Sequence, residues 1–187
     1  MLILALSWSV LQAKAGHIGL IGAQTLERAF RIIFAGVFLM LSVVPVAAGP
    51  FEDADGAQDR HDYATALRLF RLLAHQGDPN AQYRLGLMYE RGLSVPQDYA
   101  EAAAWYRRAA DQGLKTAQWT LGSMYQIGSG VQQDYVKAHM WCNLSAAQGW
   151  GAAEFMRAQL EKSMTPAQIA EAQKLAREWK PTATPPR

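Results

Sequence analysis

The sequence predicts an all-α fold, a solenoid of antiparallel helix pairs with about seven or eight helices. The first observation is an internal repeat: residues 62–97 align without gaps to residues 98–133, with 17 identities in 36 positions. The second is that each copy holds two stretches with apolar residues at helical spacing, separated by loops that contain glycine. Since one helix pair cannot bury its apolar face alone, we expect neighbouring pairs to stack.

Residues 1–48 are predicted to be an N-terminal extension plus a secretory signal peptide. Two arginines precede an apolar core at 32–44, and small residues precede a cleavage site near 48/49. An uncleaved membrane anchor is the alternative, although the core is shorter than the roughly 20 residues that span a bilayer. Because a signal peptide does not normally carry a long extension in front, we also expect translation to begin near Leu26.

The chain after the leader divides into segments that follow the repeat. We predict a short N-terminal helix or cap at 49–61, a half repeat at 62–77, full repeats at 78–113 and 114–149, a degenerate repeat at 150–163, a C-terminal capping helix at 165–180 and a disordered tail at 181–187.

Local signals mark the helix ends within each repeat. Asp98, like the corresponding Asp62 and Asp134, is a predicted N-cap. The helix that follows Asp98 is expected to stop at Gly113, which can adopt the left-handed conformation. Pro96 is excluded from a helix interior and indicates a loop.

Two glycines occupy matched positions inside predicted helices, Gly86 and Gly122. A glycine in a helix interior costs about 1 kcal/mol relative to alanine. We expect a neighbouring helix to approach so closely at both positions that a Cβ would block it.

The C-terminal segment has its own helix signals. Thr165 is a predicted N-cap, Pro166 suits the first helical position, and Gln168 completes a capping box. One apolar stripe, which we expect to cover the last repeat, consists of Ile169, Ala172, Leu175 and Trp179.

Composition excludes several classes of function. The first 48 residues hold three basic residues and one acid, so the remainder carries 18 − 3 = 15 basic and 16 − 1 = 15 acidic side chains. This balance argues against nucleic-acid binding, which depends on clustered basic residues. Cys142 is the single cysteine, so no intramolecular disulfide can form, and the four histidines are scattered. We expect no metal site and no cofactor.

The repeat pattern A-x-x-x-L-G-x-x-Y-x-x-G-x-x-V-x-x-D-Y-x-x-A, followed by an aromatic pair and A-x-x-G, resembles the Sel-like repeat. The resemblance covers roughly Phe51 to Trp179 and implies a right-handed α-solenoid related to tetratricopeptide repeats. One departure is Ser94, where the family usually has a second glycine. The paired cysteines of some secreted members are absent.

The resemblance also implies a binding surface. In such solenoids the first helices of the repeats line the concave side, and ligand contacts come from those helices. The matching positions here are Asn80, Tyr83, Leu87, Glu90, Thr116, Trp119, Ser123, Gln126, Phe155 and Gln159. The alternative is that the three rings of this set, Tyr83, Trp119 and Phe155, simply pack between adjacent helices.

Other aromatic residues, together with the cysteine, are expected in the core. Trp105, Tyr106 and Trp141 lie in mid-helix beside alanines, and Cys142 aligns with Tyr106. We expect a buried thiol and no catalytic pair with His139, because nothing supplies an orienting third group or an oxyanion hole.

The sequence therefore favours an exported, non-enzymatic scaffold or adaptor that binds another protein or a peptide. We expect it in a bacterial periplasm, with an extracellular location as the alternative, and attached to a membrane only if the leader is not cleaved. Two other functions stay open: a regulatory subunit of a cell-envelope enzyme, and a β-lactam-binding or β-lactam-hydrolysing enzyme of the kind to which the resemblance points.

Overall fold

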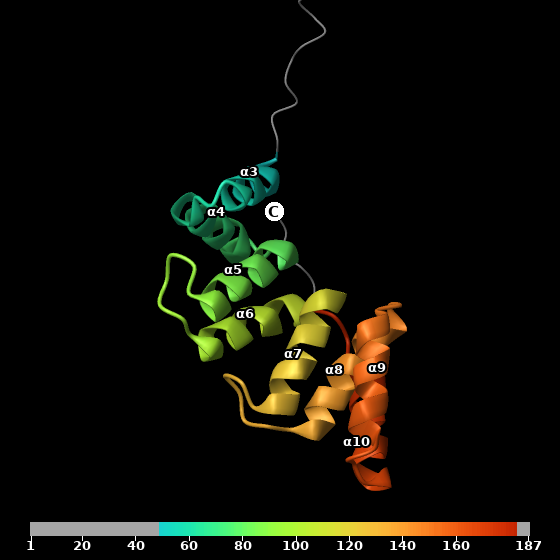
Figure 1. Cartoon of the computed structure of the whole chain (residues 1–187). Coiled ribbons are helices and arrows are strands. Elements are labelled where there is room, and N and C mark those ends of the chain that lie inside the picture. The colour runs from blue at the N-terminus through green and yellow to red at the C-terminus, as the bar shows by residue number, and fades with distance from the viewer. Residues whose placement is uncertain (1–48, 183–187) are drawn as a thin grey trace, which may run out of the picture. The chain divides into compact units, whose positions relative to one another are not determined.

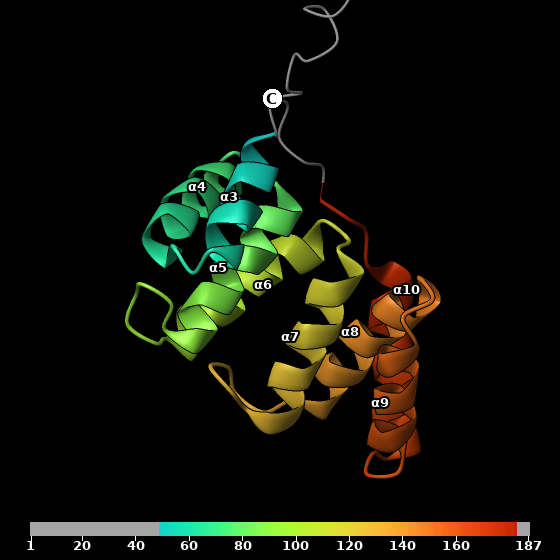
Figure 2. The same cartoon turned by 45° about the horizontal axis from the view of Figure 1, so that its top comes forward.

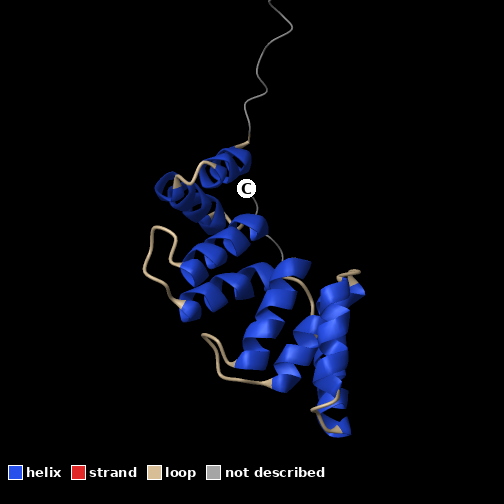
Figure 3. Cartoon of the chain, in the orientation of Figure 1, coloured by secondary structure: helices blue, strands red, loops and turns tan. Residues whose placement is uncertain are grey.

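Eight helices follow one another through residues 49–182, the part of the chain that the computed structural model describes. Within that part there is no strand, which confirms the predicted all-α class (Figure 3). The predicted leader falls outside the described residues. The helices, labelled in Figure 1, are α3 (Pro50–Asp59), α4 (Tyr63–His75), α5 (Pro79–Arg91), α6 (Tyr99–Asp111), α7 (Lys115–Ile127), α8 (Tyr135–Ala147), α9 (Gly151–Glu161) and α10 (Pro166–Glu178).

Consecutive helices from α3 to α9 pack side by side in chain order, which gives the stacked helix pairs that the repeat predicts (Figures 1 and 2). The loops 92–98 and 128–134 project from the same edge of the stack. Helix α10 breaks the order, because it packs against α8.

The predicted caps are present. The side chains of Asp62, Asp98 and Asp134 accept hydrogen bonds from backbone amides at the starts of α4, α6 and α8. In α10, the Thr165 side chain accepts from the amide of Gln168, and the Gln168 side chain accepts from the amide of Thr165. The sequence prediction of this capping box is confirmed.

The two helix-interior glycines lie at close helix contacts, as predicted. A Cβ on Gly86 would stand 2.6 Å from Tyr106 Cε1, and a Cβ on Gly122 would stand 2.8 Å from Cys142 Sγ. Real Cβ atoms essentially never approach other heavy atoms this closely. The missing side chains therefore let α6 pack onto α5 and α8 onto α7.

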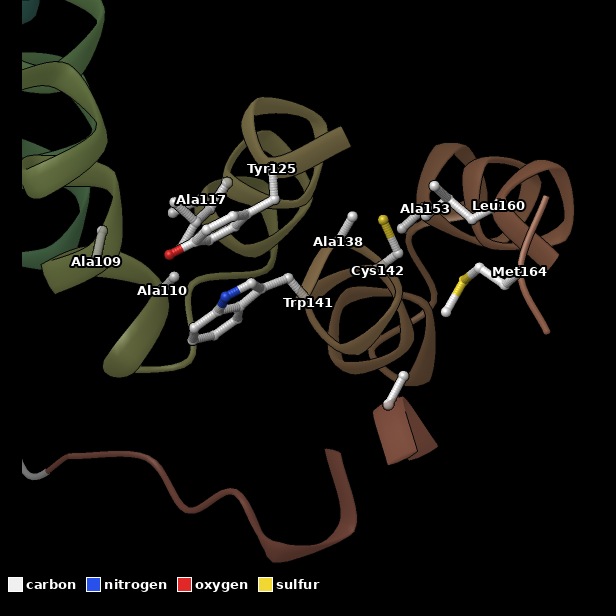
Figure 4. Close-up of a cluster of buried hydrophobic side chains, with 12 residues drawn as sticks. Ala109, Ala110, Ala117, Tyr125, Ala138, Trp141, Cys142, Ala153, Leu160 and Met164 are labelled. Carbon is white, nitrogen blue, oxygen red and sulfur yellow. The ribbon is translucent and has the colours of Figure 1, made fainter. Parts of the chain in front are cut away.

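The core is apolar and rich in alanine. Trp105, Tyr106, Trp141 and Cys142 are all buried, as the sequence predicts. In Figure 4 the rings of Tyr125 and Trp141 point toward Ala109 and Ala110 of α6. These two rings therefore fill the space between the second repeat and the helix before it.

A ladder of glutamine side chains, which was not predicted from the sequence, links successive helices. Gln82 Nε2 donates to the carbonyl of Ala74 at 3.2 Å, and Gln118 Nε2 donates to the carbonyl of Ala110 at the same distance. A glutamine from the next helix donates to each: Gln112 to Gln82 Oε1 at 2.8 Å, and Gln148 to Gln118 Oε1 at 2.9 Å. Both central glutamines are buried, so the ladder satisfies polar groups that burial would otherwise leave without partners.

Residues 179–182, the last that the structure describes, lie against α8 and α6. The ring of Trp179 meets that of Trp141 with centroids 6.3 Å apart. The amide of Thr182 donates to the carbonyl of Asp111 at 2.7 Å. Residues 181–182 are thus held against the end of α6, whereas the sequence analysis expects a disordered tail from 181; the backbone hydrogen bond is the reason for the difference. Residues 183–187 lie outside the described residues.

Candidate functional site

The ten residues predicted for the concave surface lie on α5, α7 and α9. They differ widely in exposure. Phe155 is 68% exposed, and Asn80 is also exposed. The remaining eight are partly buried: Tyr83, Leu87, Glu90, Thr116, Trp119, Ser123, Gln126 and Gln159.

On α5, three of the four predicted residues contact α6. The Tyr83 ring packs against the Tyr106 ring with centroids 5.4 Å apart, and Leu87 packs against the same buried cluster. Glu90 Oε2 accepts a short hydrogen bond from the Tyr106 hydroxyl. Burial and the neighbouring Glu90 carboxylate raise the pKa of Tyr106 above its ordinary value. These three side chains therefore belong to the α5–α6 interface.

On α7, Trp119 contacts the residue that precedes α9. Its ring lies 6.3 Å from that of Trp150, centroid to centroid, and the Lys115 ammonium stands 5.7 Å from the Trp150 ring. Ser123 and Gln126 lie further along the same helix, and the backbone carbonyl of Gln126 accepts from Gln133 Nε2 at 2.8 Å. Trp119 thus combines a packing role with partial exposure.

On α9, Phe155 is much more exposed than its counterparts Tyr83 and Trp119. Gln159 Oε1 accepts a hydrogen bond from the Lys162 ammonium at 3.0 Å. Among the described residues, the ring contacts of Tyr83 and Trp119 are with Tyr106 and Trp150. The three rings of the predicted surface, Tyr83, Trp119 and Phe155, therefore do not form one stack.

A shallow pocket of about 380 Å³, which was not predicted from the sequence, lies beside the loop before α8. It is lined by Tyr125, Val131, Gln132, Gln133, Asp134 and Lys137. The guanidinium of Arg107 and the ammonium of Lys137 each lie 5.5 Å from the Tyr125 ring. The Lys137 ammonium also pairs with Asp134 at 3.0 Å. The sequence signal that could have indicated this site is a repeated pair: Arg71 and Tyr89 match Arg107 and Tyr125 of the next repeat. In the structure, each arginine donates to the hydroxyl of its tyrosine.

The cysteine is a core residue. Cys142 is fully buried, and Figure 4 shows it among Ala138, Ala153 and Leu160. Burial raises the pKa of the Cys142 thiol to about 12, against an opposing effect of the Arg157 cation. His139 Nε2 faces Glu161 Oε1 at 3.0 Å. This arrangement agrees with the predicted buried thiol, since a nucleophilic cysteine needs a lowered pKa.

Within residues 49–182, no three or more His, Cys, Asp or Glu side chains are grouped so that they could hold a metal ion. No helix in the same range has the length and apolar character needed to cross a membrane.

Comparison with known proteins identifies the repeat. A family model described as the Sel1 repeat matches residues 53–78, 79–114 and 116–150. No curated protein matches the chain.

Two solved structures are similar to the chain. One is a protective antigen present in uropathogenic Escherichia coli strains and displaying an SLR fold, with 36% identity and a TM-score of 0.59 over 62% of this chain and 25% of that one. The other is a Sel1 repeat protein from Oxalobacter formigenes, with 26% identity and a TM-score of 0.58 over 70% of this chain and 56% of that one. The chain thus spans a quarter of the first relative and just over half of the second.

Proposed function

Because the chain belongs to the Sel1 repeat family, we propose that it is a non-enzymatic scaffold that captures a peptide or a partner protein on the surface formed by α5, α7 and α9. Proteins of this family typically act as protein-interaction scaffolds. A stack of helix pairs offers an extended surface for such binding.

The exposure of Phe155 is the observation that carries the proposal. Its side chain is 68% exposed on the helix layer that also holds the partly buried Trp119 and Gln126. Large aromatic side chains are enriched among the residues that dominate binding energy at protein interfaces. A phenylalanine with this exposure is therefore a suitable anchor for a partner.

We further propose that the protein is exported, to a bacterial periplasm or to the outside of the cell. The arginines and apolar core at 32–44 support this location. Sequencing the N-terminus of the protein recovered from the native compartment tests it. A mature chain that begins near Gly49 is the expected result, and an intact leader on cytoplasmic protein would contradict export.

Site-specific photo-crosslinking of the full chain in its native host tests the binding surface. A photoreactive amino acid at Gln126 should trap a partner, which mass spectrometry then identifies. The same amino acid at Gln173, an exposed position on α10, is the matched control. Phe155→Ala should reduce the yield from Gln126 while the melting temperature hardly changes. Equal yields from Gln126 and Gln173 would refute the proposed surface.

A further inference from the structure

Helix α9 exposes a face that its counterparts α5 and α7 bury. Phe155, Ala158 and Lys162 are all exposed and lie three and four residues apart, so they share one side of the helix. We call these three residues the open face of α9. Helices α5 and α7 each pack against the helix before and the helix after, whereas α9 packs against α8 and α7, and α10 packs against α8.

The earlier repeats show which residue of the next helix packs on such a face. The residues of α5 that match the open face are Tyr83, Gly86 and Glu90, and all three meet Tyr106 of α6. The Tyr83 ring lies 5.4 Å from the Tyr106 ring, the Tyr106 ring lies over Gly86, and Glu90 accepts from the Tyr106 hydroxyl. On α7, Cys142 of α8 packs against the matching Gly122 in the same way.

The open face differs from its counterparts in two ways that define its ligand. Ala158 carries a Cβ where Gly86 and Gly122 have none, so the residue seated there must be smaller than tyrosine. Lys162 stands in place of Glu90. Its ammonium donates to Gln159 Oε1 at 3.0 Å and carries no acceptor atom of its own, so it can meet a ligand only as a donor. The ligand must therefore offer an acceptor at that end.

Charge also sets the direction of the ligand. Glu154 is exposed near the start of α9 and Lys162 is exposed beyond its end. A helix antiparallel to α9 places its N-terminal turn near Lys162 and its C-terminal turn near Glu154. Helices commonly carry acidic residues in the first turn and basic residues in the last, which stabilise the helix dipole. Both ends would then meet an opposite charge.

We propose that the open face of α9 binds an amphipathic helix of a partner protein, antiparallel to α9, in the place that α6 takes on α5 and α8 takes on α7. This helix carries a small residue at its centre, seated on Ala158, an acidic first turn near Lys162 and a basic last turn near Glu154. The inference rests on the proposed scaffold function and names its partner class.

The chain itself supplies the probe. A peptide with the sequence of residues 98–113 contains α6 and its caps, with Asp98 and Glu101 at the start and Arg107 and Arg108 near the end. A staple between positions 100 and 104, both exposed in the protein, holds the isolated helix without touching its packing face. The two probes are this peptide with Tyr106 and the same peptide with Tyr106→Ala, each labelled for fluorescence anisotropy.

The full chain is expected to bind the Tyr106→Ala peptide and to bind the Tyr106 peptide at least tenfold more weakly. The double variant Ala158→Gly/Lys162→Glu restores the α5 type of face and should reverse this preference. Phe155→Ala should weaken both complexes at least tenfold. Leu72→Ala, which alters another exposed apolar residue (53% exposed) on α4, is the control and should leave both affinities unchanged. Circular dichroism verifies that each variant is folded.

Three results would overturn the inference: no saturable binding of either peptide, binding that Phe155→Ala leaves intact, or a dimer of the full chain that Phe155→Ala dissociates. The last result would show that a second copy covers the face. If crosslinking at Gln126 still captures a partner, the scaffold function stands while this inference fails. If the peptides bind as expected but Gln126 and Gln173 crosslink equally, helix binding at the open face is supported. Partner binding on the wider surface of α5, α7 and α9 is then refuted.

Discussion

Gly86 of α5 lies directly under the ring of Tyr106 of α6, so close that a Cβ on Gly86 would stand 2.6 Å from Tyr106 Cε1. We expect Gly86→Ala to destabilise the protein, although alanine favours a helix by about 1 kcal/mol. Overpacking of a tight core typically costs about 1–3 kcal/mol and here exceeds that gain. Urea unfolding followed by circular dichroism measures the change.

Gly56 provides the matched control, because it also lies inside a helix. A Cβ on Gly56 would meet only the Arg60 guanidinium, at 3.4 Å. We expect Gly56→Ala to be neutral or to stabilise the protein by up to about 1 kcal/mol. If both substitutions had the same effect, close helix approach would not explain Gly86.

Gln118 is the buried centre of the second half of the glutamine ladder. Gln118→Met keeps the length of the side chain but removes the donor to the carbonyl of Ala110 and the acceptor for Gln148. The Ala110 carbonyl still accepts from the Gly113 amide, so the loss comes from the two hydrogen bonds of the Gln118 side chain, which together contribute about 1–3 kcal/mol. We expect a loss of unfolding free energy in this range. The control, Gln173→Met at an exposed site of α10, should change it by less than about 0.5 kcal/mol; equal losses would show that the ladder does not stabilise the fold.

The buried thiol of Cys142 predicts a loss of stability in alkali. Its pKa is raised from an ordinary value of 9.0 to about 12 in the folded protein. A raised pKa contributes stability that is complete below pH 9 and is lost as the pH rises toward 12, because the unfolded chain loses the proton first. The slope approaches about 1.4 kcal/mol per pH unit between the two pKa values.

Cys142→Ala isolates this contribution. The difference in unfolding free energy between the parent chain and the variant should shrink by about 1 kcal/mol from pH 9 to pH 10, because half of the unfolded thiols are already ionised at pH 9. Urea unfolding under reducing conditions at pH 8, 9 and 10 measures it. A difference that stays constant over this range would contradict the raised pKa.

The capping box at the start of α10 gives a prediction with a conservative control. Thr165→Ala removes the hydroxyl that accepts from the Gln168 amide at 3.3 Å, and we expect a loss of about 1 kcal/mol. Thr165→Ser keeps the hydroxyl and should retain most of the stability. Thermal unfolding of both variants tests this, and equal losses would mean that the cap contributes nothing to the docking of α10.

Much of the fold could be predicted from the sequence, because its signals are local. Asp98, Thr165 and Gln168 cap helices through residues two or three positions away, and the paired Gly86 and Gly122 indicated close contacts through their repetition. The burial of Trp141 followed from its place beside alanines in mid-helix.

The rest depended on which helices meet, and local patterns do not specify that. The apolar stripe of α10 shows which side is buried, but not that it packs against α8 and leaves Phe155 exposed. Tyr83 occupies a position typical of a binding surface, yet its ring packs on Tyr106. Gln82 and Gln118 are polar residues that the sequence pattern would place at the surface, yet both are buried. The same residue at two matched repeat positions was the signal that could have indicated the ladder.

The glutamine ladder has a consequence for how such an array could grow. Each rung joins a glutamine to a carbonyl eight residues earlier and to a glutamine 30 residues later, so an inserted copy of 36 residues carries its own rung and fits the neighbours on both sides. An insertion that is not a whole number of 36-residue copies interrupts the register. The third copy has Glu154 at the matching position, an acid that has no amide to donate. Duplication of an internal repeat can therefore lengthen the array, whereas the last unit cannot continue the ladder because Glu154 cannot donate the hydrogen bond.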